Sequence, residues 1–143
     1  ALVFGEPMLG HLRRAQRDDG SWMGHWWDDD EYATARATEA LARARTDPEA
    51  VARAASWAEG RVEASPFATA LAVQTLRAAG RGDGVIAPAR ARLIGQQRSD
   101  GSWTPSARLR VPAPDAIKPN EGALSYVDDE ALFTTATVVA ALQ

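Results

Sequence analysis

The segment of this sequence that is richest in chemistry is Trp26-Trp27-Asp28-Asp29-Asp30-Glu31-Tyr32. Carboxyl groups that crowd together can retain a proton, because a neighbouring negative charge raises the pKa of a carboxyl group. The faces of Trp and Tyr rings attract cations. Groups that could donate a proton and groups that could stabilise positive charge are therefore adjacent in the chain.

The same acids also have a structural explanation. Asp and Glu are favoured at the start of a helix, where they cap free N–H groups and complement the helix dipole. This interpretation applies to Asp28 through Glu31, and equally to Asp128, Asp129 and Glu130. Both interpretations of the first cluster stay open at the level of sequence.

Two seven-residue segments repeat with one substitution between them. They are Gln16-Arg17-Asp18-Asp19-Gly20-Ser21-Trp22 and Gln97-Arg98-Ser99-Asp100-Gly101-Ser102-Trp103. A second element recurs three times, as Tyr32-Ala33-Thr34-Ala35, Phe67-Ala68-Thr69-Ala70 and Phe133-Thr134-Thr135-Ala136. Asp-Gly-Ser supplies a tight turn, Gln can bond exposed backbone, and Trp can cover a helix joint. The sequence therefore predicts three units with one plan and a packing role for the repeated Gln and Trp.

Helices are the elements that must position these residues. Alanine is abundant and apolar residues recur at spacings of three and four, so the predicted class is all-α. The predicted helices span about 6–17, 29–45, 48–59, 66–79, 86–97 and 129–142. The first, third and fifth carry arginines beside an apolar stripe and are expected outside. Their partner helices are expected inside, because those at 66–79 and 129–142 carry little charge through their middles.

Residues 104–127 interrupt this plan. They contain Pro105, Pro112, Pro114 and Pro119, show no clear period, and exceed the usual length of a connection. We interpret this proline-rich insert as a lid, a packing arm or a flexible insert within a single domain that covers residues 1–143.

The repeated Gln-x-x-x-Gly-x-Trp element resembles the QW motif of the superfamily of squalene-hopene cyclases, class II terpenoid cyclases and protein prenyltransferases. The resemblance rests on Gln16, Gly20 and Trp22, on their second copy, and on the Thr-Ala segments. It implies an α/α toroid with inner and outer rings of helices. A closed toroid has roughly twice the helices predicted here, so the chain is expected to form a partial toroid of about six helices.

The resemblance also implies site residues. In class II cyclases an Asp-x-Asp-Asp motif starts an inner helix, and its carboxylic acid protonates an alkene or epoxide. Asp28 and Asp30 are similar in type and become the predicted catalytic residues, although three residues separate Asp30 from Thr34 where the family has none. The predicted substrate-binding residues are Trp26, Trp27, Tyr32, Phe67 and Phe133.

Composition excludes several functions. The chain has 143 residues, no Cys, two His and a net charge of −3. The absence of Cys excludes thiolate zinc sites, disfavours the zinc-dependent prenyltransferase branch, and leaves no metal or cofactor expected. No basic stripe suits nucleic acid, and no apolar run or signal segment suits membrane insertion, so we expect a cytoplasmic protein.

Two functions fit these observations. The first is part of a class II terpenoid cyclase-like enzyme that acts on a hydrophobic isoprenoid by protonation-initiated cyclisation. The second is a non-catalytic repeat domain that binds a lipid or protein partner or completes a larger toroid. The open ends of the arc are expected to be covered by the rest of a longer chain, by a second copy in a homodimer, by the insert, or by Leu2, Val3 and Phe4. Peripheral contact with a membrane is compatible with either function.

Overall fold

The computed structural model describes residues 5–118 and 121–143, so Leu2, Val3, Phe4 and Pro119 lie outside the described residues. Its elements are α1 (Glu6–Ala15), α2 (Glu31–Arg43), α3 (Pro48–Glu59), α4 (Pro66–Ala78), α5 (Asp83–Gly95), β1 (Arg108–Val111), β2 (Leu124–Val127) and α6 (Leu132–Leu142). Each predicted helix is present, and no helix end differs from its prediction by more than three residues.

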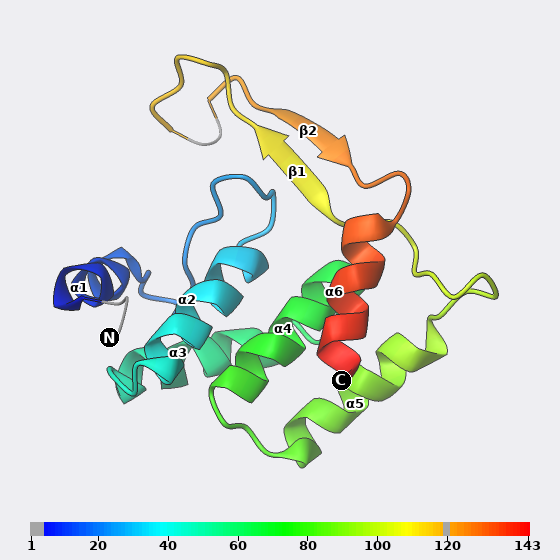
Figure 1. The fold of residues 1–143 in the computed structure, drawn as a ribbon, viewed down its shortest axis with the longest axis horizontal. Helices are drawn as coiled ribbons and strands as arrows, with labels where there is room; N and C mark the ends of the chain where they lie inside the picture. Colours follow the sequence, from blue (N-terminus) through cyan, green and yellow to red (C-terminus); the bar gives the residue numbers. More distant parts are fainter. Residues whose placement is uncertain (1–4, 119–120) are drawn as a thin grey trace.

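The helices form two layers (Figure 1). Helices α2, α4 and α6 lie side by side, with α4 in contact with both neighbours. Helix α3 packs against α2 and α4, and α5 packs against α4. Helix α1 joins this outer layer through Leu9, which shares a core cluster with Leu41 of α2 and Ala54 of α3. The predicted alternation of inner and outer helices is confirmed.

A capping side chain starts helix α4 and a glycine follows its end. The Ser65 hydroxyl accepts a hydrogen bond from the Ala68 N–H at 3.3 Å, which caps α4. At the other end Gly80 adopts a φ of +72°, and the Arg81 N–H donates to the Leu76 carbonyl at 2.9 Å. Asp47 precedes α3 but makes no cap with its side chain, which instead pairs with Arg13 at 2.8 Å.

The two repeated segments have the same geometry. Trp22 and Trp103 are both buried, and each indole N–H donates to a carbonyl of an outer helix, that of Leu12 at 2.8 Å and that of Leu93 at 2.6 Å. The side-chain amides of the two repeated glutamines each donate to the carbonyl of the Gly four residues later at 3.0 Å. The predicted packing role of these residues is confirmed.

The proline-rich insert contains a feature that the sequence did not predict. Strands β1 and β2 pair antiparallel, with Arg108 opposite Val127 and Val111 opposite Leu124. The all-α expectation holds for both helical layers and misses this hairpin. The strands are four residues long and largely exposed, so they lack the alternation of buried and exposed residues that identifies a strand.

Asp128 connects the hairpin to α6. Its carboxylate accepts hydrogen bonds from the N–H groups of Leu132 at 3.0 Å and Thr134 at 2.8 Å. The structural interpretation of this acid is therefore confirmed. Helix α6 starts at Leu132 rather than near residue 129, because Ala131 before it adopts a positive φ of 55°.

Candidate functional site

Four aromatic rings converge at the end of the inner layer next to the hairpin. The Trp27 ring centroid lies 5.3 Å from that of Tyr32, 5.1 Å from that of Phe67 and 5.7 Å from that of Phe133. These separations are typical of aromatic pairs that attract one another. We call Trp27, Tyr32, Phe67 and Phe133 the aromatic cluster.

The aromatic cluster is assembled from the starts of three inner helices and one loop. Tyr32, Phe67 and Phe133 each occupy the second position of α2, α4 and α6, while Trp27 comes from the loop before α2. Four of the five predicted substrate-binding residues thus lie together. The fifth, Trp26, is 55% exposed and packs edge-on against His25 with centroids 4.9 Å apart.

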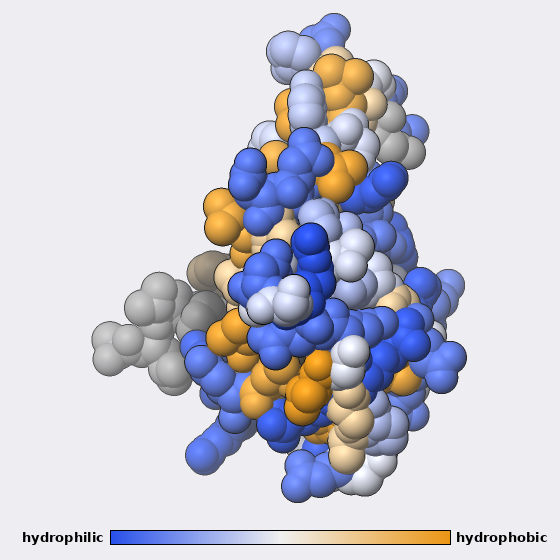
Figure 2. Space-filling model, turned by 90° about the vertical axis from the view of Figure 1, so that its right-hand side faces the viewer, coloured by the Kyte–Doolittle hydropathy of each residue, from blue (hydrophilic) through white to orange (hydrophobic). Residues whose placement is uncertain are grey.

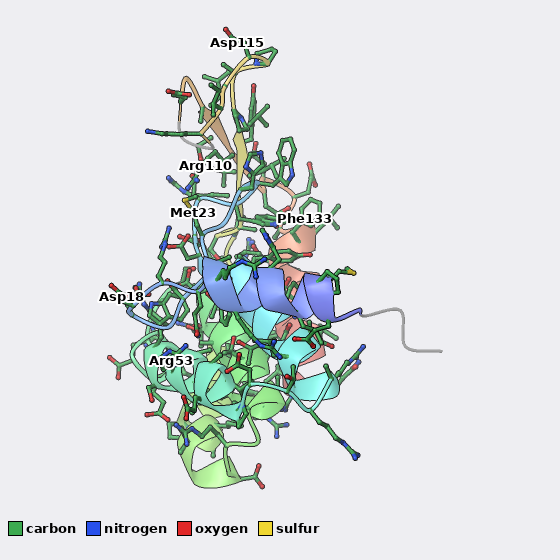
Figure 3. The ribbon with its side chains drawn as sticks, turned by 90° about the vertical axis from the view of Figure 1, so that its left-hand side faces the viewer. Asp18, Met23, Arg53, Arg110, Asp115 and Phe133 are labelled. Atoms are coloured by element: carbon green, nitrogen blue, oxygen red, sulfur yellow. The ribbon has the colours of Figure 1, made fainter. Side chains whose placement is uncertain are left out.

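The cluster opens onto the inner face. The Phe133 side chain is 60% exposed, whereas Phe67 beside it is buried. Figure 3 shows Phe133 on one side of the molecule and Asp18 and Arg53 toward the opposite side. Strand β2 carries further exposed apolar residues, among them Leu124 and Tyr126. Figure 2 shows hydrophobic groups among hydrophilic ones at the top of the molecule.

Strand β1 holds the loop that carries Trp27. Trp27 forms an isolated antiparallel bridge with Leu109. The Arg110 N–H donates to the Trp26 carbonyl at 2.8 Å, and the Asp28 N–H donates to the Arg108 carbonyl at 3.0 Å. The loop therefore lies along the hairpin as a third extended segment, and this pairing sets the position of the Trp27 ring.

Asp28 binds the hairpin through its side chain. The Arg110 Nε donates to Asp28 Oδ1 at 3.2 Å, and the Ser125 hydroxyl donates to Asp28 Oδ2. The same guanidinium also donates to the carbonyls of Gly24 at 3.2 Å and Asp28 at 2.9 Å. Arg110 and Ser125 were not among the predicted site residues. Arg108 and Arg110 of the insert are opposite in charge to the acidic segment, which is a sequence signal for the pair with Asp28. No such signal indicates Ser125.

Asp30 binds the beginning of its own loop. Arg17 contacts its Oδ2 at 2.5 Å, and the Gly24 N–H donates to its Oδ1 at 2.9 Å. Asp30 occupies the residue before α2, but its side chain does not cap that helix. Both predicted catalytic acids thus accept a charge-assisted hydrogen bond from an arginine.

The other two acids of the segment differ from this pair. Burial raises the pKa of Asp29, and the nearby charge of Asp28 raises it further. Burial likewise raises the pKa of Glu31, which is 5% exposed and lies 3.8 Å from Arg61. A raised pKa favours the protonated form, so the crowded acids retain protons at Asp29 and Glu31 more readily than isolated carboxyl groups would.

Within residues 5–118 and 121–143, no three His, Asp or Glu side chains converge in a way that could hold a metal ion. No helix in the same ranges is long and apolar enough to cross a membrane.

Comparison with known proteins identifies structures with the same arrangement of helices. No protein-family model and no curated protein sequence matches the chain. A protein of known structure from Actinoplanes superimposes with a TM-score of 0.89 at 39% identity, covering 99% of this chain and 51% of its own. The type II terpene cyclase MstE from Scytonema superimposes with a TM-score of 0.87 at 32% identity. This match covers 94% of this chain and 49% of the MstE chain.

A more distant match extends the comparison. The ent-copalyl diphosphate synthase from Streptomyces platensis superimposes with a TM-score of 0.65 at 25% identity, covering 94% of this chain and 26% of its own. The chain thus spans about half the length of the first two proteins. Together with the two helical layers, these matches show that the chain has a class II terpenoid cyclase-like fold.

Proposed function

We propose that this chain forms about half of the α/α toroid of a class II terpenoid cyclase-like enzyme and supplies the aromatic wall of its isoprenoid cavity. The observation that carries the proposal is the aromatic cluster, whose partly exposed rings lie at the open inner face. Such rings offer apolar area to a hydrocarbon chain and attract the positive charge of a carbocation.

The relatives support an isoprenoid substrate. Further structures of MstE from Scytonema hold geranylgeranyl dihydroxybenzoate, its substrate, and merosterolic acid A, its product. We propose a polyprenyl substrate for this chain as well, cyclised in the manner of squalene-hopene or diterpene cyclases. The equivalent geometry of the two Gln-x-x-x-Gly-x-Trp elements supports the relation to QW-motif repeats.

The open side of the arc belongs to the same proposal. Helix α6 exposes the apolar side chains of Leu132, Phe133 and Val139. The chain itself spans about half the length of the first two structural relatives. Apolar faces of repeat proteins are buried on neighbouring repeats. We therefore propose that further helices of the toroid cover this side and close the cavity.

Binding and product analysis test the proposal. The chain is incubated with geranylgeranyl diphosphate or squalene, bound ligand is measured by equilibrium dialysis, and products are identified by mass spectrometry. Trp27→Ala should weaken binding about tenfold, because a large apolar contact is lost. Trp57→Ala is the control, since Trp57 belongs to outer helix α3. Equal affinities of the two variants would contradict the proposal, and binding without product by a protein that contains the complete toroid would favour a non-catalytic repeat domain.

A further inference from the structure

Corresponding positions join each inner helix to the next one along the chain. The junction between α2 and α4 uses Ala35, the fifth residue of α2, which shares a core cluster with Phe67. The junction between α4 and α6 uses Ala70 and Val73, the fifth and eighth residues of α4, which share a core cluster with Val138 of α6. These residues are all buried. The fifth and eighth positions of an inner helix thus face its successor.

The last inner helix exposes these same positions. In α6 they are Ala136 and Val139, which are both exposed. Leu132 and Ala140 are exposed beside them. Because the four residues follow one another at spacings of four, three and one, they form an apolar stripe along one face of the helix. We call Leu132, Ala136, Val139 and Ala140 the α6 stripe.

The first inner helix leaves the opposite surface open. An inner helix meets its predecessor through its seventh and tenth positions, because Val138 and Ala141 of α6 are buried in the cluster that contains Val73 of α4. The corresponding residues of α2 are Ala37 and Ala40. Both line a groove between α1 and α2.

Two adjoining hollows of about 450 Å³ each make up this groove, which we call the α1–α2 groove. Met8 on its α1 side is 55% exposed, and Leu12 lines both hollows. Counting back from the repeated glutamines, Met8 and Leu12 correspond to Ala89 and Leu93 of α5. Those two residues are buried in the cluster that contains Val73 of α4. The α1–α2 groove therefore has the place on the first repeat that α4 fills on the second.

We infer that the α6 stripe of one copy of this chain docks in the α1–α2 groove of a second copy, in the way that α4 docks on α5 and α6. Both halves of one helix junction are present on the chain, and α4 separates them (Figure 1). Docking removes the apolar side chains of both surfaces from water. The inference rests on the proposed function, because the second copy supplies the further helices that close the cavity.

The length of the chain sets the number of copies. The chain spans 51% and 49% of the first two structural relatives, so two copies have the length of one such protein. A head-to-tail contact forms a closed ring when its rotation closes. In a ring of two copies each α6 stripe fills the groove of the other copy, and neither surface stays exposed.

Introduced cysteines test which surfaces meet. The chain has no Cys, so a disulfide can form only at the chosen positions. Ala40→Cys lies in the groove and Val139→Cys on the stripe. On oxidation a mixture of these two single variants should form a disulfide-linked dimer, whereas neither variant alone should. A dimer of Ala40→Cys with itself would show that two grooves face each other and would overturn the head-to-tail contact.

A matched variant controls for chance collisions in the crosslinking experiment. Val85 of outer helix α5 is 42% exposed, against 43% for Val139, and lies outside both surfaces. A mixture of Val85→Cys and Ala40→Cys should form no more dimer than Ala40→Cys alone. Equal crosslinking of Ala40→Cys with the two partners would overturn the proposal.

Sedimentation velocity tests the strength of the contact. The unmodified chain should sediment with twice the mass of one chain. Val139→Lys should weaken self-association at least about tenfold, because docking removes the charged group from water. Lysine in the last turn of α6 complements the helix dipole, so circular dichroism should show an unchanged helix content. Val85→Lys is the control and should leave self-association unchanged. A monomeric unmodified chain, or equal effects of the two lysine variants, would overturn the proposal and leave the groove to a different protein.

Failure of the proposed function gives a different result. If the chain forms the head-to-tail dimer but binds neither geranylgeranyl diphosphate nor squalene, the contact stands and the isoprenoid function is wrong. If a monomeric chain binds these ligands and Trp27→Ala weakens the binding, the isoprenoid function stands and the contact between copies is wrong.

Discussion

The Arg110 guanidinium lies 3.2 Å from the carboxylate of Asp28, a residue 82 positions earlier in the chain. Both side chains are mostly buried, with 16% and 25% of their surface exposed. The pair joins the hairpin to the loop that carries Trp27. The hairpin within the proline-rich insert thus packs against the loop that carries Trp27.

Removing this pair should release the hairpin. Arg110→Ala deletes the bonds to Asp28 and Gly24, and we expect it to lower the free energy of unfolding by about 1–3 kcal/mol. Hydrogen–deuterium exchange of residues 108–127 should become faster. Arg108→Ala is the control, because that side chain is exposed and makes no such bonds among the described residues. Unchanged exchange in Arg110→Ala would show that the strand pairing alone holds the hairpin.

Asparagine variants separate the two roles of the predicted catalytic acids. Asn keeps the shape of Asp but removes the transferable proton and the negative charge. Because Asp28 and Asp30 already accept hydrogen bonds from Arg110 and Arg17, we expect Asp28→Asn and Asp30→Asn to lower the melting temperature and to leave the products unchanged. Loss of all cyclised product from a folded variant with unchanged stability would instead identify that residue as the general acid.

The two repeat glycines offer a matched test of packing at the turns. Gly20 and Gly101 have φ values of +93° and +84°, so alanine at either position carries a strain of about 1–2 kcal/mol. A Cβ at Gly20 would also lie 2.5 Å from the Arg53 carbonyl oxygen, whereas none of the described atoms lies within 4 Å at Gly101. In urea unfolding, Gly20→Ala should therefore be the more destabilising by about 1–3 kcal/mol. Equal losses would show that the backbone of α3 moves to accommodate the methyl group.

Glu31 should make stability depend on pH. Burial raises the pKa of Glu31 above its ordinary value of 4.5, so the folded chain binds this proton more tightly than the unfolded chain. The resulting stability is present in full below about pH 4.5 and is lost as the pH rises through the raised pKa. The melting temperature of Glu31→Gln should therefore exceed that of the unmodified chain by an amount that grows from pH 4 to pH 8. Glu63→Gln changes an exposed acid and should show no such trend.

The sequence alone determined the helical plan of this protein. Spacings of three and four between apolar residues, the Ser65 cap, Gly80 and the repeated turns act within one or two helical turns, so their structural effects are local and can be predicted. The same local pattern placed Tyr32, Phe67 and Phe133 at corresponding positions of three recurring segments.

Only the tertiary structure decided which residues those positions meet. The strands of the hairpin are short and exposed, and their pairing with residues 26–28 depends on contacts across about 80 residues, which no local period encodes. The same is true of the partners of Asp28. Arg36, Gln74 and Thr137 become neighbours because three inner helices pack side by side, and packing of the whole chain, rather than local sequence, brings such distant residues together.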